Sequence, residues 1–283
     1  MRTRAVALPT LTLVTGLAAC DASARPQPSA VAPAPLISSA PPTTTPSTAG
    51  SWDGWEIGAH PLPRRPDGFG EVESTPVALR NRVLPTRDSL PPPADGEYTS
   101  AISEVPADVL ARSTWQAGCP VDRTRLRYLT MAFWGFDGRA HTGEMLVNAS
   151  VAQDVTQVFG RLFAARFPIE EMRVTRADEL DAAPTGDGNN TSAFVCRPVR
   201  GQPNWSAHAY GLAVDLDPFC NPYSRGDLVL PELASAYLDR SWRRPGMILP
   251  GDATVRAFSA IGWSWGGKWV SPTDRMHFSA TGT

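Results

Sequence analysis

Two short segments of the chain each combine a histidine with a carboxylate. The first runs from Ser206 to Asp215 and contains His208, and the second contains Asp274 and His277. The chain has only 4 histidines, so half of them lie in these two segments. Two neutral imidazoles and one carboxylate would bind a zinc ion and leave its fourth position to water, as a catalytic zinc site requires. The two segments therefore suggest metal-assisted hydrolysis.

A plainer interpretation of the same residues is structural. Buried histidines are commonly held by a backbone carbonyl, and His208 and His277 could both be of this kind. Asp274 could then orient His277 instead of reacting. The other two histidines, His60 and His141, lie outside both segments, and we expect neither of them to bind a metal.

The residue pattern of the two segments favours the metal site. The first segment resembles the S-x-H-x-x-G-x-A-x-D signature of the D-alanyl-D-alanine carboxypeptidase family of metallopeptidases, and Asp274-x-x-His277-Phe278 resembles the second half of that family's site. All fixed positions of the signature are filled, by Ser206, His208, Gly211, Ala213 and Asp215. The resemblance also includes Gly118–Val121, Trp134–Gly138, Asn190–Pro198 and Trp263–Gly267, so it covers roughly residues 105 to 279. It is closest to the subgroup that includes L-alanyl-D-glutamate endopeptidases.

The resemblance implies a role for each polar residue of the two segments. It makes His208, Asp215 and His277 the ligands of a Zn²⁺ cofactor and Asp274 the general base that takes a proton from the attacking water. Ser206 is expected to hold the loop beside the metal.

Arg197 is the candidate for a cation that stabilises the negative oxygen of the tetrahedral intermediate. It lies in the segment Phe194–Pro198, which resembles the part of the family that precedes the signature. The alternative for Arg197 is an ordinary surface ion pair.

The cysteines divide into an anchor and a structural group. The resemblance implies a disulfide between Cys119 and Cys196 that braces the neighbouring Arg197, and it leaves Cys220 as a free thiol. Cys20 follows a short apolar stretch, Ala5–Ala19, and the sequence before it resembles the lipobox of bacterial lipoproteins. We expect Cys20 to be acylated. The alternative is an ordinary secretory signal, and both place the mature protein outside the cytoplasm.

Composition divides the chain into four parts. Residues 1–20 are expected to be the lipoprotein signal, and residues 21–50, rich in Pro, Ala, Ser and Thr, a disordered tether. Residues 51–96 form a proline-rich lead segment whose Trp55 and Phe69 suggest packing on the domain that follows. Residues 97–283 are expected to be the catalytic domain.

The catalytic domain is expected to have an α+β fold, a small antiparallel sheet flanked by helices. Asp137-Gly138 predicts a hairpin turn between strands at 126–136 and 142–147. Ser150 is expected to cap a helix that runs to about residue 167. Further strands are expected near 172–174 and at 211–216, and a second helix at 252–261.

Charge and composition limit the classes of partner. The formal net charge of -2 and the isoelectric point near 6.1 give no basic surface for nucleic acid. The expected protein is a monomer that binds peptidoglycan peptides as substrate and the membrane through its lipid anchor. A cell-wall-binding module without catalysis, or a structural lipoprotein, are the alternatives. The sequence leaves open whether the enzyme is a carboxypeptidase or an endopeptidase.

Overall fold

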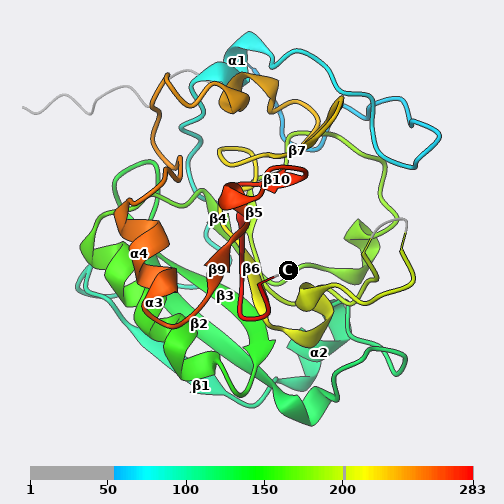
Figure 1. Cartoon of the computed structure of the whole chain (residues 1–283). Helices are drawn as coiled ribbons and strands as arrows, with labels where there is room; N and C mark the ends of the chain where they lie inside the picture. The colour runs from blue at the N-terminus through cyan, green and yellow to red at the C-terminus, as the bar shows by residue number, and fades with distance from the viewer. Residues whose placement is uncertain (1–53, 200–201, 283) are drawn as a thin grey trace, which may run out of the picture. The chain divides into compact units, whose positions relative to one another are not determined.

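The structure is a computed structural model that describes residues 54–199 and 202–282 (Figure 1). The described residues all belong to one compact unit. The signal sequence with Cys20 and the expected tether lie outside the described residues. Within the described part, no helix has both the length and the apolar character needed to cross a membrane.

The longest strands form the hairpin that the sequence predicts. Strand β2 (Leu126–Trp134) pairs antiparallel with β3 (Ala140–Asn148), and Leu129 lies opposite Met145. Gly138 has a φ of 74°, which glycine adopts without strain in this tight turn. A third strand, β1 (Ser100–Ser103), pairs with the other edge of β2.

Two helices cover this hairpin and form the main core with it. Helix α3 (Ala152–Ala164) contacts β2, and α4 (Ala253–Ser259) packs against α3. The apolar side chains of α3 recur at helical spacing and face inward. They are Val155, Val158, Phe159 and Leu162, all 1% exposed or less. Asp252 caps α4 by accepting a hydrogen bond from Val255 N at 2.9 Å.

Smaller sheets carry the two segments that combine a histidine with a carboxylate. Strands β6 (Ala213–Asp215), β11 (His277–Ser279) and β9 (Ser264–Trp265) form one antiparallel sheet with β11 in the middle. Strands β10 (Thr273–Asp274), β7 (Tyr223–Arg225) and β8 (Leu228–Leu230) form another. Strand β4 (Glu171–Met172) pairs in parallel with β5 (Asn190–Thr191).

Short helices fill the connections between these strands. Two are single α-helical segments, α1 (Val77–Arg80) and α2 (Ala107–Arg112). The others are 3-10 helices, η1 (Arg123–Arg125), η2 (Ala177–Glu179), η3 (Ala207–Tyr210), η4 (Ser235–Leu238) and η5 (Gly266–Lys268).

The lead segment is part of the folded unit. Leu79 and Leu84 are buried in a second apolar cluster together with Phe219 and Tyr237. The Trp55 indole N–H donates a hydrogen bond to Asp187 Oδ2 at 3.0 Å. The expected boundary near residue 97 therefore does not separate two bodies, and residues 54–96 pack on the rest of the chain as their aromatic residues suggest.

The α+β class is confirmed, with several differences in detail. The structure has several small sheets where one was expected, and one strand pair is parallel. Ser150 does not cap α3: its hydroxyl and its backbone N–H both donate to Asn148 Oδ1, and the N-cap residue is Val151. Asn148 thus forms a local side-chain turn with Ser150, and this turn competes with capping of the helix.

Candidate metal centre

The segment of the first histidine forms one short helical turn that leads into a strand. Ser206 precedes η3, and its hydroxyl oxygen accepts a hydrogen bond from His208 N at 3.3 Å. Gly211 ends the turn with a φ of 68°, and a Cβ there would lie 2.6 Å from Asn148 N. Glycine is therefore required both for the left-handed conformation and for the close approach to β3. Strand β6 follows and ends at Asp215.

Strand pairing brings the second histidine to the first segment. In the sheet of β6 and β11, His277 lies directly opposite Asp215. Phe278, the next residue, is fully buried and stacks on Phe258 of α4 with ring centroids 3.9 Å apart. Since successive side chains of a strand point to opposite faces, the burial of Phe278 in the core turns His277 toward the other face.

Three ligand atoms of the predicted site converge. His208 Nε2 lies 3.2 Å from His277 Nδ1 and 3.2 Å from Asp215 Oδ1, and His277 Nδ1 lies 3.0 Å from Asp215 Oδ1. In a tetrahedral zinc site with bonds of about 2.0–2.1 Å, neighbouring ligand atoms are roughly 3.3 Å apart. The three measured separations are therefore close to one face of such a tetrahedron.

The hydrogen bond on the far side of one imidazole supports this arrangement. His208 Nδ1 donates to the backbone carbonyl of Ala193 at 2.6 Å, so in the neutral ring Nε2 carries a lone pair. This contact is the one that the structural interpretation of the histidines expects, but here it also orients Nε2 toward the other two ligand atoms. Together His208, Asp215 and His277 form a group that could hold a metal ion.

The carboxylates of the site have opposite electrostatic environments. Burial raises the pKa of Asp215, but the charges and hydrogen bonds of His208 and His277 lower it by more, and the net pKa lies well below its ordinary value. Burial, followed by the negative charge of Asp215, raises the pKa of Asp274 to about 7. Asp274 Oδ1 is buried without a hydrogen-bond partner in the described residues. Two carboxylates with separated pKa values suit a ligand and a general base.

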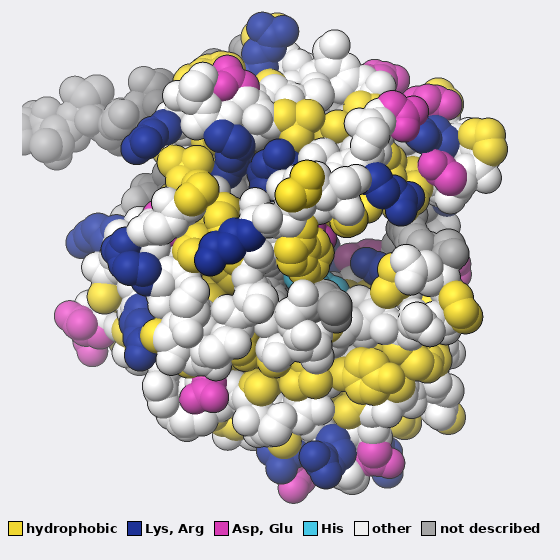
Figure 2. Space-filling view, in the orientation of Figure 1, with side chains coloured by type: hydrophobic (Ala, Val, Ile, Leu, Met, Phe, Trp, Pro, Cys, Tyr) yellow, Lys and Arg dark blue, Asp and Glu magenta, His cyan; other side chains and the backbone are white. Residues whose placement is uncertain are grey.

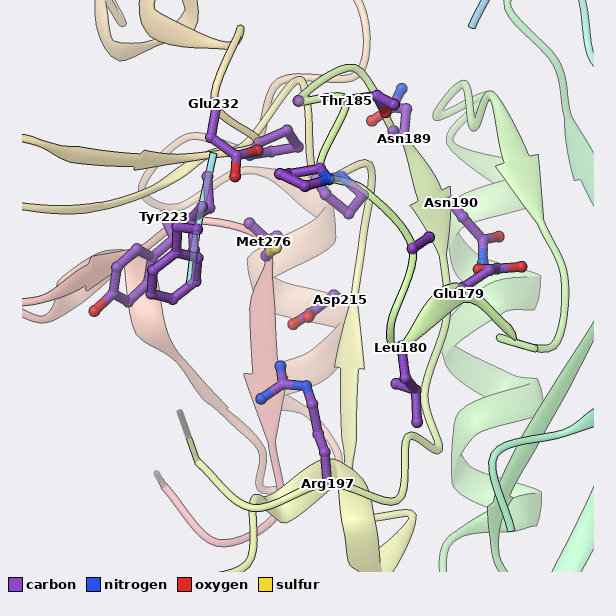
Figure 3. Close-up of a pocket in the computed structure, with 18 of the residues that line it drawn as sticks. Glu179, Leu180, Thr185, Asn189, Asn190, Arg197, Asp215, Tyr223, Glu232 and Met276 are labelled. Carbon is purple, nitrogen blue, oxygen red and sulfur yellow. The ribbon is translucent and has the colours of Figure 1, made fainter. Parts of the chain in front are cut away.

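Arg197 reaches the same site from another segment. Its guanidinium donates to the carbonyl of Pro198 at 3.3 Å and forms no ion pair within residues 54–199 and 202–282, so the surface ion pair considered from the sequence is not formed. In Figure 3 its side chain points toward Asp215. The structure forms the Cys119–Cys196 disulfide that the resemblance implies, next to Arg197, and Cys220 is a free, buried thiol.

A single large cleft contains the site. Its cavity volume is about 1670 Å³, and its lining includes the three ligand residues, Asp274 and Arg197. Figure 2 shows histidine surface at the floor of a hollow. The lead segment contributes to the lining of this cleft, through residues such as Phe69 and Leu84. The sequence predicts that the lead segment packs on the domain, but it does not predict that this segment lines the cleft.

Two asparagines near the site, Asn189 and Asn190, have structural roles. The side-chain amides of Asn189 and Asn190 are both used inside the protein. Asn189 donates to Glu170 and accepts from Phe219 N, and Asn190 bonds the backbone N–H and carbonyl of Arg173. Among the tryptophans near Asp274, Trp263 and Trp265 are core residues. Trp269, in contrast, lines the cleft, with its ring 5.6 Å from that of His277.

A comparison with known families agrees with this geometry. A family model described as D-alanyl-D-alanine carboxypeptidase matches residues 200–280. The stretch is less than a third of the chain, but it contains all the residues of the candidate metal site and Asp274. The match supports a peptidase, and so a hydrolase. The family that it supports is the D-alanyl-D-alanine carboxypeptidases, with no choice among their subgroups. No curated protein and no solved structure matches the chain.

Proposed function

We propose that the protein is a zinc-dependent peptidase that cuts a peptide bond in the stem peptides of peptidoglycan. The observation that carries the proposal is the triangle of His208 Nε2, His277 Nδ1 and Asp215 Oδ1, with sides of 3.0 to 3.2 Å, beside the buried Asp274. Three atoms with lone pairs at such distances repel one another unless a cation or a proton lies between them. The triangle therefore favours a bound metal ion over a pair of structural histidines.

The residues around the triangle divide the catalytic work. Zinc bound there would supply a Lewis acid and lower the pKa of water toward about 7. Asp274 takes the proton of the attacking water and returns it to the amine that leaves. Arg197 donates to the substrate carbonyl oxygen as negative charge develops on it. Ser206 keeps His208 in place through the hydrogen bond to its backbone N–H.

The proposed location agrees with the chemistry. The apolar leader that ends at Cys20 and the Pro- and Ser-rich stretch after it support a lipid-anchored enzyme outside the cytoplasmic membrane. An enzyme tethered in this way would meet an insoluble wall polymer without having to diffuse to it. A monomer is sufficient, since all the proposed catalytic groups belong to one chain.

The size of the cleft favours a substrate longer than a dipeptide. Sites for small ligands commonly enclose about 300–1,000 Å³, and this cleft is larger, at about 1670 Å³. Both an endopeptidase that cuts L-alanyl-D-glutamate and a carboxypeptidase that removes terminal D-alanine from a stem peptide fit this description. The masses of the fragments released from peptidoglycan would distinguish the two.

The decisive experiment measures metal content and peptidoglycan digestion on the full chain. Wild type should hold one zinc per chain and release peptide fragments. His208→Ala should lose both properties, and Asp274→Ala should keep the metal and lose cleavage. His60→Ala, which changes an exposed histidine outside the site, is the matched control and should keep both.

Two other results would select an alternative. Bound zinc without cleavage by the wild-type protein would favour a module that binds cell-wall peptides without cutting them. Wild-type protein that binds no metal would contradict the peptidase mechanism altogether.

A further inference from the structure

A buried carboxylate lies at the end of the cleft away from Arg197. Glu232 lines the cleft and is only 6% exposed. Figure 3 shows Glu232 and Arg197 at opposite ends of the view, with Met276 and Asp215 between them. Glu232 belongs to neither of the two segments that carry the proposed catalytic groups, and nothing in the proposed reaction uses it.

Apart from Asp181, which is exposed, the other acidic side chains that border this part of the cleft already have partners. Arg173 forms ion pairs with Glu171 and Glu179, and Arg82 forms one with Glu170. The Asp187 carboxylate accepts hydrogen bonds from Trp55 Nε1, Gly58 N and Thr185 Oγ1.

Glu232 differs from these residues because it has no cation beside it and accepts only one hydrogen bond within the described chain. Its Oε1 accepts one hydrogen bond, from Gly70 N of the lead segment at 2.7 Å. Its Oε2 makes no hydrogen bond to the described residues, and no arginine, lysine or histidine among them forms an ion pair with Glu232. The nearby Arg64, whose backbone pairs with Gly70, directs its guanidinium to the carbonyls of Gly68, Asp181 and Ala182.

An ionised carboxylate in this position is costly without a cation beside it. Removing such a group from water is unfavourable unless it is paired and hydrogen-bonded, and only one of the two oxygens of Glu232 has a protein donor. A primary ammonium group has three N–H donors and a full positive charge, and it fits one free carboxylate oxygen at the wall of a cleft. We propose that Glu232 binds an ammonium group of the substrate, with Gly70 N holding the carboxylate in place.

The pairing of strands gives the distance from this subsite to the reacting bond. Asp274 lies opposite Tyr223, and Tyr223 lies opposite Leu230, in one row across β10, β7 and β8. Neighbouring strands are about 4.8 Å apart, so this row is roughly 10 Å wide. Glu232 follows two residues after Leu230. An extended peptide advances about 3.3 Å per residue, so a substrate side chain about three or four residues from the cut bond would reach Glu232.

The inference rests on the proposed peptidase function and names a specificity residue for it. The ammonium group could be the side chain of a diamino acid within the stem peptide or the free N-terminus of a short peptide. Both sources present the same chemical group to Glu232, and acetylation of one amine at a time separates them.

Binding can be measured independently of cleavage. All proteins carry Asp274→Asn, are loaded with zinc and are titrated by calorimetry with a synthetic stem peptide that contains lysine. Acetylation of the lysine amine should weaken binding by roughly tenfold or more, as expected for loss of a hydrogen bond between charged groups. Adding Glu232→Gln should weaken binding of the free peptide to a similar extent and abolish the difference between the two peptides. Gln retains an acceptor for Gly70 N, so the loop is preserved.

Asp181→Asn is the matched control. Asp181 is an exposed carboxylate of the same cleft that holds Arg64 through its backbone carbonyl alone, and its substitution should leave the preference for the free amine unchanged. If only acetylation of the N-terminus weakened binding, the subsite would bind a terminal amine. Equal binding of all the peptides to the parent protein, or no binding of any of them, would overturn the inference. Cleavage by the wild-type enzyme, measured separately, tests the peptidase function itself.

Discussion

Arg82 and Glu170 form a two-point ion pair in the interior of the protein. Arg82 Nε donates to Glu170 Oε2 at 2.5 Å, and Nη2 donates to Oε1 at 2.7 Å. The arginine side chain is completely buried. The pair joins the lead segment to the residue directly before β4, on the lining of the cleft. It therefore connects the fold of the catalytic site to residues that the sequence places before the domain.

Replacing one member of this pair should strongly destabilise the protein. Arg82→Met leaves Glu170 buried without its cation, which typically costs about 3–5 kcal/mol. Urea unfolding should show this loss as a lower midpoint with a similar slope. Arg87→Met is the control, because Arg87 lies in the same segment, is exposed and makes no ion pair in the described chain. Its effect should stay within about 0.5 kcal/mol, and an equally small effect of Arg82→Met would contradict the importance of the pair.

Removal of the metal should stop cleavage but leave the fold intact. The ligand residues are held by the backbone, through Ala193 O for His208 and through the pairing of β6 with β11 for Asp215 and His277. Chelation should therefore lower the melting temperature without abolishing the cooperative transition. Zinc at 1,000 times its Kd would stabilise the protein by about 4.1 kcal/mol. A chelator should not shift the melting temperature of His208→Ala. If it also failed to shift the melting temperature of the wild type, that result would contradict a bound metal.

The raised pKa of Asp274 predicts how cleavage depends on pH. Asp274 must be ionised to accept a proton, so activity should fall as pH drops through its pKa, which is about 7 without metal. A bound cation favours the charged carboxylate, so the midpoint in the zinc enzyme should lie at or below that value. A pH profile of kcat/KM would show this acidic limb. Because zinc can lower this midpoint, the contradicting result is a kcat/KM that stays constant down to about pH 4, near the ordinary pKa of 3.8.

The same pKa predicts how the stability of the metal-free protein depends on pH. Between the ordinary value of 3.8 and about 7, the folded protein holds the Asp274 proton more tightly than the unfolded chain. This contribution to the unfolding free energy is present at low pH and is lost as pH rises through that window. Asp274→Asn should therefore gain stability relative to wild type between pH 5 and pH 8. Urea titrations of both metal-free proteins at the two pH values measure the difference.

The Cys119–Cys196 disulfide should contribute both stability and activity. It links residues separated by 77 positions, and a loop of that length predicts a stabilisation of about 4 kcal/mol from restriction of the unfolded chain. Replacing both cysteines by serine should lower the melting temperature. It should also reduce kcat more than it affects zinc content, because Arg197 follows Cys196 directly whereas the ligands lie on other segments. A loss of stability with an unchanged kcat would show that the disulfide does not position Arg197 for catalysis.

The parts of the fold that were predicted from sequence have strong local signals. Asp137-Gly138 gives the turn of the hairpin through backbone preference alone, and Asp252 caps α4 where the sequence places the helix. Ser150 failed as a cap because Asn148, two residues earlier, binds its hydroxyl and its N–H. A serine before an apolar helical pattern predicts an N-cap whether or not another side chain binds that serine. The sequence therefore could not show that Asn148 takes up the hydroxyl of Ser150.

Some residues of the candidate site could likewise be predicted from the sequence, and others could not. His208, Asp215, Asp274 and His277 could be proposed because their two segments resemble the two halves of a known family's site. Glu232 could not, because a single glutamate after a proline has no distinctive spacing and its position depends on Gly70, 162 residues away. The sequence also could not predict that the lead segment lines the cleft. An aromatic residue such as Phe69 predicts burial, but it does not tell which residues it will contact.

The Trp55 contact with Asp187 has a mechanical consequence. The described chain begins at Gly54, and the next residue is fastened by its indole to a carboxylate that lines the cleft. Any tension on the chain before Gly54 is therefore transmitted first to this wall, and only afterwards to the hairpin of β2 and β3. A pull from the N-terminus would act on the wall of the cleft before it acts on the core.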